Sequence, residues 1–80
     1  MNNTDIKQKL RNFICDNLGV ENSILTDELQ LFDGGICLDS IDSIELISFV
    51  NEVFNVSIAG VDRNVFTNLN TLTNYIESNL

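Results

Sequence analysis

The sequence predicts an all-α fold: a small antiparallel four-helix bundle with one short third helix and a long first loop. Three observations lead to this prediction. Apolar residues recur at helical spacing in several segments, the chain has no proline and no internal repeat, and 44% of its 80 residues are hydrophobic. A chain of this length forms one domain, residues 1–80, whose core supplies only about 3–5 kcal/mol of net stability.

The first helix is predicted from about Asn3 to Leu18, because its apolar residues fall on one helical face. These residues are Ile6, Leu10, Phe13, Ile14 and Leu18. Gly19 is a natural stop, since glycine readily takes the left-handed conformation that ends many helices. Three of the four basic residues lie on this helix, and the simplest interpretation of Lys7, Lys9 and Arg11 is a solvated face.

From Val20 to Leu38 the chain is polar without a sustained period, which predicts a long loop. Loops of this length in small domains are usually functional or held in place by their own side chains. We expect scattered apolar residues to hold this one, with a short helical turn near Thr26 to Leu29. The apolar residues are Ile24, Leu25, Leu29, Leu31 and Phe32.

The second helix is predicted from about Ser40 to Phe54, so Ser40 lies at or near its N-cap. The arc expected to face the core carries Leu46, Ile47, Phe49, Val50, Val53 and Phe54. The opposite arc carries Ser40, Ile41, Ile44, Glu45, Ser48, Asn51 and Glu52. Isoleucines within a rim of acids indicate either a docking surface or the outer side of an imperfectly amphipathic helix.

Two further elements complete the predicted bundle. A short helix is expected around Asp62 to Phe66, and a final helix from about Asn70 or Thr71 to Asn79. Asn70 is a possible cap for the final helix. Its apolar side carries Leu72, Ile76 and Leu80.

The acidic charge of the chain is unevenly distributed. The net charge is −8, and the window from Asn12 to Asp62 holds ten of the twelve acidic residues and no Lys or Arg. Such a surface repels nucleic acid and anionic lipid, and it favours encounter with basic protein patches. No apolar run approaches the roughly 18 residues of a membrane span, and residues Met1 to Asp5 do not have the basic and then apolar pattern of a secretory signal. We therefore expect a soluble, cytoplasmic protein with no nucleic-acid partner.

The side chains give little support for catalysis or metal binding by the domain itself. The chain has no His, which excludes Ser-His-Asp and Cys-His arrangements. Cys15 and Cys37 are too few for a disulfide framework or a four-ligand zinc site, and they fit a reducing compartment. Asp39 and Asp42 are a carboxylate pair, but a bundle this small offers little cleft for acid–base chemistry.

The segment Leu38-Asp39-Ser40-Ile41-Asp42-Ser43-Ile44-Glu45-Leu46 resembles the modification site of the acyl carrier proteins. That family has an Asp-Ser-Leu or Asp-Ser-Ile motif at the start of its second helix, with acids at the positions held here by Asp42 and Glu45. The resemblance covers essentially the whole chain, including the loop residues Leu31-Phe32-Asp33-Gly34-Gly35 and the order of the helices.

The resemblance implies that Ser40, flanked by Asp39 and Ile41, is the attachment point of a 4′-phosphopantetheine group. A separate phosphopantetheinyl transferase would add the group from coenzyme A, and acyl chains would be carried on its terminal thiol as thioesters. The other implied partners are acyl-transfer and chain-elongation enzymes with basic docking patches, and we expect a monomer. The implied recognition residues are Asp42, Ile44, Glu45, Ser48 and Glu52. Capping of the second helix by Asp39 and Ser40 is compatible with this role.

Departures from the family pattern leave the pathway open between type II fatty-acid synthesis and polyketide or specialised lipid synthesis. Ser48 occupies a position often held by Met, and Asn51 one often held by an acid; the loop ending in Gly34-Gly35-Ile36-Cys37 is also slightly unusual. The alternatives are an aminoacyl or peptidyl carrier and an acidic helical interaction module without a prosthetic group. Asp42 and Glu45 favour the acyl type over the aminoacyl type.

Overall fold

The computed structural model describes residues 2–32 and 40–80. Within these residues the chain forms three α-helices and one 3-10 helix, with no strand. The elements are α1 (Asn3–Asn17), α2 (Ser40–Phe54), η1 (Arg63–Phe66) and α3 (Leu69–Ser78). The prediction of an all-helical fold is confirmed. The count of four helices is not, because the expected short third helix is a single 3-10 turn.

The two ends of helix α1 are set by an N-terminal side-chain cap and a C-terminal glycine. The Asn2 side chain caps its N-terminus by accepting a hydrogen bond from the Asp5 N–H at 2.8 Å. At the other end Gly19 adopts a φ of 74°, which confirms the expected glycine stop. The helix buries Ile6, Leu10 and Ile14, while Phe13 is partly buried.

Helix α2 has the predicted bounds and buries Leu46, Val50 and Phe54 in the core. The chain leaves the helix at Asn55, whose φ of 57° places it in the left-handed region that asparagine tolerates. Val53 was assigned to the core arc, but its side chain is 41% exposed. This assignment is wrong, because Val53 lies at an edge of the arc, over an open groove beside α1.

Both η1 and α3 have a side-chain cap at the N-terminus, and the cap of α3 is not the residue that was expected. Asp62 caps η1, and Asn68, rather than Asn70, caps α3. Asn68 and Thr71 form a reciprocal capping box in which each side chain accepts a hydrogen bond from the backbone of the other. Leu80 lies beyond the end of α3 and is 57% exposed, so helical spacing no longer directs it to the core.

The first loop is held against the C-terminal half of the chain. Leu25 and Leu31 are buried, and Phe32 packs edge to face on Phe66 with ring centroids 6.1 Å apart. A short turn at the predicted place is closed by a hydrogen bond from the Leu29 N–H to the Thr26 carbonyl. Ile24 is not an anchor, because it is 51% exposed beside the buried Leu25.

Two backbone hydrogen bonds connect this loop to the segment that precedes and begins α3. The Leu31 N–H donates to the Thr67 carbonyl at 2.9 Å, and the Asn70 N–H donates to the Asp27 carbonyl at 3.2 Å. The described part of the loop is therefore tied to the same end of α3 at two points.

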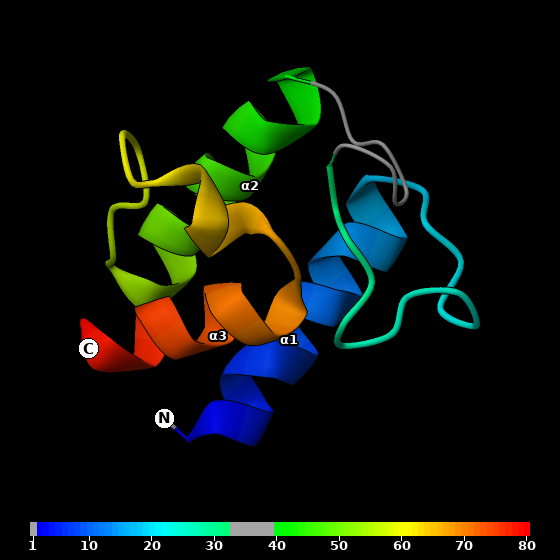
Figure 1. The fold of residues 1–80 in the computed structure, drawn as a ribbon, viewed down its shortest axis with the longest axis horizontal. Helices are drawn as coiled ribbons and strands as arrows, with labels where there is room; N and C mark the ends of the chain where they lie inside the picture. Colours follow the sequence, from blue (N-terminus) through cyan, green and yellow to red (C-terminus); the bar gives the residue numbers. More distant parts are fainter. Residues whose placement is uncertain (1, 33–39) are drawn as a thin grey trace.

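The three helices are not packed equally closely. The Cα atoms of α1 and α3 repeatedly approach within 8 Å, whereas α2 stays farther from its neighbours. Large side chains fill the added distance, since the rings of Phe13 and Phe49 stack with centroids 4.2 Å apart. Figure 1 shows α2 (green) with its first turn at the outer edge of the molecule.

Candidate functional site

The candidate site is the start of α2. Ser40 is the first residue of this 15-residue helix, and Asp42 lies in its first turn. The backbone N–H groups of a helical first turn have no partners within the helix, so they favour an anionic group nearby. Asp39, which was predicted to flank the attachment point at Ser40, lies outside the described residues, as does Cys37.

The outer face of α2, which we define as Ile41, Ile44, Glu45, Ser48, Asn51 and Glu52, is exposed along its whole length. Ile41 and Ile44 are 66% and 63% exposed, as the helical spacing predicts. Asp42 differs from these residues because it is half-buried. The outer face thus presents two neighbouring apolar side chains, Ile41 and Ile44, directly after Ser40, and the carboxylates of Glu45 and Glu52 farther along the helix.

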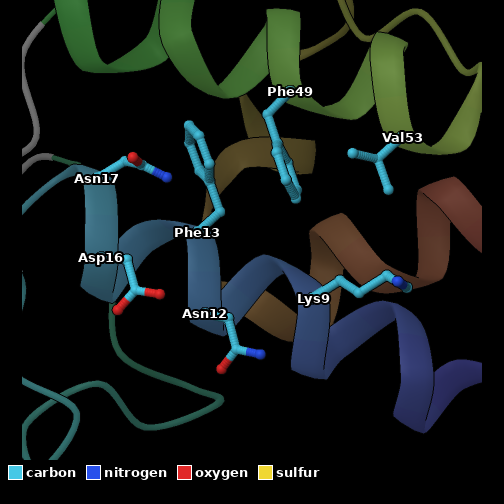
Figure 2. A pocket seen from close by; sticks show the side chains of 7 residues that line it. All are labelled: Lys9, Asn12, Phe13, Asp16, Asn17, Phe49 and Val53. Atoms are coloured by element: carbon cyan, nitrogen blue, oxygen red, sulfur yellow. The ribbon is translucent and has the colours of Figure 1, made fainter.

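A shallow groove runs along the opposite side of α2, between this helix and α1. Its volume is about 300 Å³, and it is lined by Lys9, Asn12, Phe13, Asp16, Asn17, Phe49 and Val53. Figure 2 shows Phe49 and Val53 on α2 and the Phe13 ring pointing toward them from α1. The other lining residues, Lys9, Asn12, Asp16 and Asn17, also belong to α1. The stacked rings of Phe13 and Phe49 form its apolar floor, so the sequence pattern alone, which treats both as core, does not predict it.

An ionic cluster fixes the loop that leads toward the candidate site. The Asp27 carboxylate accepts hydrogen bonds from Arg11 Nη2 at 2.9 Å and from Lys7 Nζ at 3.3 Å. Arg11 also donates to the Leu25 carbonyl and, at 3.3 Å, to Asn22 Oδ1. Lys7 and Arg11 are therefore not simply part of a solvated face. Their spacing of four residues on α1 is a sequence signal, but nothing local identifies Asp27 as their partner.

The charge environment of Asp27 follows from this cluster. Partial burial would by itself raise the pKa of the Asp27 carboxyl. The hydrogen bonds from Arg11 and Lys7, together with their positive charges, outweigh that effect and hold the pKa of Asp27 below its ordinary value. Protonation of Asp27 at low pH is therefore expected to weaken the attachment of the loop to α1.

Three other features of the described part of the chain concern metal sites, reactive thiols and membrane-spanning helices. No group of three or more His, Cys, Asp or Glu side chains there is arranged to hold a metal ion. Cys15 is a half-buried free thiol whose Sγ lies 3.9 Å from Asn22 Oδ1. None of the described helices is long and apolar enough to cross a membrane.

Comparison with known proteins places the chain near one family model and a curated relative. The sequence model of the phosphopantetheine attachment site family matches residues 8–76. An acyl carrier protein from Guillardia theta is 30% identical over 76 residues, which cover 95% of this chain and 93% of that protein. The family match includes the start of α2 and its outer face.

Proposed function

Because the chain belongs to the acyl carrier protein family, whose members carry a 4′-phosphopantetheine group and are not catalysts, we propose that Ser40 is the residue that receives the group. The observation that carries this proposal is the position of Ser40 as the first residue of α2, within the matched residues 8–76. Asp39 and Ile41 flank it in the sequence and are proposed as its immediate recognition context.

The residues around Ser40 are compatible with such a group. A phosphodiester at an exposed helix N-terminus is favoured by about 0.3–1 kcal/mol, because the free N–H groups carry partial positive charge. Ile41 and Ile44 are more than half exposed, so a modifying enzyme has access to this end of the helix. The chain has no His to act as a base for the Ser40 hydroxyl, and that role falls to the transferase.

The group supplies a terminal thiol on which acyl chains are held as thioesters. The role of this chain is then to hold the attachment point on a rigid helix, to present it to partner enzymes, and to shelter the acyl chain. We propose that the cargo belongs to type II fatty-acid synthesis or to polyketide or specialised lipid synthesis. We further propose that the protein works as a cytoplasmic monomer.

Partner recognition is proposed to use Asp42, Ile44, Glu45, Ser48 and Glu52. Four of these lie on the exposed outer face, and the half-buried Asp42 lies in the first turn beside Ser40. The net charge of −8 favours partners with basic patches, including the phosphopantetheinyl transferase and the acyl-transfer and chain-elongation enzymes. Exposed isoleucines inside an acidic rim add an apolar contact once a basic partner has docked.

The test of this proposal is loading by a transferase. Incubation with coenzyme A and a broad-specificity phosphopantetheinyl transferase is expected to add one group per chain by intact-mass measurement. Ser40→Ala should add none, whereas Ser57→Ala, which removes an exposed hydroxyl beyond α2, should load normally. Circular dichroism of both variants checks that they fold. Loading of Ser40→Ala, or a modified peptide that maps to Ser43 or Ser48, would refute the assignment.

The loading measurement separates one alternative, and the choice of cargo separates the other. An acidic interaction module without a prosthetic group would remain unmodified in all three proteins. An aminoacyl or peptidyl carrier would load but would then accept amino acids rather than acyl chains from its partner enzymes.

A further inference from the structure

Thr73 is the one polar side chain in the buried core of the described residues. It is completely buried on α3, and its hydroxyl Oγ1 has no hydrogen-bond partner there. It shares the inner face of α3 with Leu69, Leu72 and Ile76, which are also fully buried. The hydroxyl is therefore surrounded by an apolar core.

An unpartnered hydroxyl in such a place is unfavourable. A threonine in a helix commonly satisfies its hydroxyl by donating to the carbonyl four residues earlier, but Thr73 makes no such bond. Valine has nearly the same shape and would fill the same space without the desolvation penalty. The hydroxyl is therefore available to an atom that is not part of the described fold.

We propose that the Thr73 hydroxyl binds an oxygen substituent on the acyl chain, and so selects hydroxylated or keto-bearing cargo over plain aliphatic cargo. This inference rests on the proposed function, because the cargo must be attached at Ser40 and sheltered inside the bundle. A threonine hydroxyl both donates and accepts, so it fits either a hydroxyl or a keto oxygen.

The dimensions of the molecule allow the contact. A phosphopantetheine arm has about fifteen bonds, equal to five residues of extended chain, and spans about 17 Å. An eight-carbon chain adds about 10 Å on the same scale. The longest dimension of the protein is 28 Å, so a cargo oxygen attached through Ser40 can reach any depth of the core.

The three helices differ in how closely they pack, and the side of α2 is where we infer that the cargo enters. α3 lies close to α1, whereas α2 is held at a greater distance through side chains such as Phe49. The inner side of α2 carries the fully buried residues Leu46 and Val50, so an acyl chain that entered there would displace or contact apolar side chains. Thr73 is then the one described core side chain able to pair with an oxygen on that chain.

The test compares cargo with and without an oxygen in matched variants. The wild type, Thr73→Val and Thr73→Ser are converted to the pantetheine form and loaded, through stable amide analogues, with octanoyl or with octanoyl bearing a hydroxyl at carbon 3, 5 or 7. Intact mass confirms loading at Ser40 before any further measurement. Melting temperature is then measured for the unloaded and the loaded proteins.

For the unloaded protein, Thr73→Val is expected to raise the melting temperature by about 4–8 °C, because it removes an unsatisfied buried hydroxyl. For the loaded wild type, at least one hydroxylated chain should stabilise as well as or better than octanoyl. In Thr73→Val every hydroxylated chain should stabilise less than octanoyl. Thr73→Ser retains the hydroxyl and should retain the wild-type preference, which distinguishes recognition from a general packing effect.

Several outcomes would overturn the proposal. If Thr73→Val lowers the melting temperature of the unloaded protein, the hydroxyl is already satisfied by a buried water or a carbonyl. If the preference among chains is the same in the wild type and in Thr73→Val, the hydroxyl does not contact the cargo. If no chain changes any melting temperature, the cargo stays outside the core. None of these results affects the loading of Ser40, which is measured separately.

Discussion

Replacing Asp27 by asparagine removes the centre of the cluster that pins the first loop to α1. The Asp27 carboxylate pairs with Arg11 at 2.9 Å and with Lys7 at 3.3 Å. Its side chain is 42% exposed, so both pairs are substantially screened by solvent. Arg11 keeps its hydrogen bonds to the Leu25 carbonyl and Asn22 Oδ1, which limits the loss.

The expected magnitude follows from these contacts. Exposed ion pairs contribute about 0.2–1 kcal/mol each, so loss of the two pairs should lower the free energy of unfolding at pH 7 by about 0.5–1.5 kcal/mol. For a domain of this size the melting temperature should fall by about 3–10 °C. Because the whole protein has only about 3–5 kcal/mol of net stability, this change is readily measured.

The effect should depend on pH in a defined direction. The pKa of Asp27 in the folded protein is lowered relative to its ordinary value. A lowered pKa means that the carboxylate contributes its full stabilisation above the unfolded-state pKa of about 3.9, and that this contribution is lost as the pH falls through the folded-state value. The difference between the wild type and Asp27→Asn should therefore be constant near neutral pH and shrink toward pH 3.

The assay is chemical denaturation at pH 7 and at pH 3, with Glu28→Gln as the matched control. Glu28 is the next residue of the same loop, is exposed, and makes no ion pair with the described residues. Both substitutions relieve the general repulsion of a chain with net charge −8, so their difference isolates the cluster. Equal effects of the two substitutions, or a difference that persists unchanged at pH 3, would refute this account of the loop.

Two further predictions concern partners and cargo. Charge reversal to Lys at Asp42, Glu45 or Glu52 should slow transferase loading by about threefold to tenfold at low salt, whereas the control Glu77→Lys on the exposed side of α3 should have little effect. Stopped-flow measurement of association in low and high salt checks this. Association rates that are insensitive to both salt and charge reversal would contradict electrostatic docking. Lengthening the acyl chain from four to eight carbons should raise the melting temperature progressively, since each sheltered methylene contributes about 0.8 kcal/mol. The variant Ile47→Phe should reduce that gain, because the larger side chain fills space beside the half-buried position 47. A melting temperature independent of chain length would place the cargo in solvent.

The parts of the fold that depend on neighbouring residues could be predicted from the sequence. The α1 stop at Gly19, the bounds of α2 and the exposure of Ile41 and Ile44 all follow from helical spacing and local backbone preference. The motif at Ser40 likewise identifies the family, because its residues are contiguous in the chain.

The parts that depend on distant residues could not be predicted in this way. Periodicity assigns Val53 to the core, but whether an edge position is covered depends on how far α1 lies from α2. The cap of α3 is a different case, because the reciprocal bonds between Asn68 and Thr71 join residues only three positions apart, and this local pattern was available in the sequence. The pairing of Asp27 with Lys7 spans twenty residues of chain and has no local signature.

The looser attachment of α2 has a kinetic consequence. Because α1 and α3 approach each other closely while α2 lies farther from both, we expect the free energy needed to lift α2 away to be smaller than that needed to unfold the domain. Backbone amides on the inner side of α2 would then exchange with solvent through a local opening that leaves the α1 and α3 pair intact. A guest molecule could enter and leave through the same opening, at a rate set by the movement of one helix.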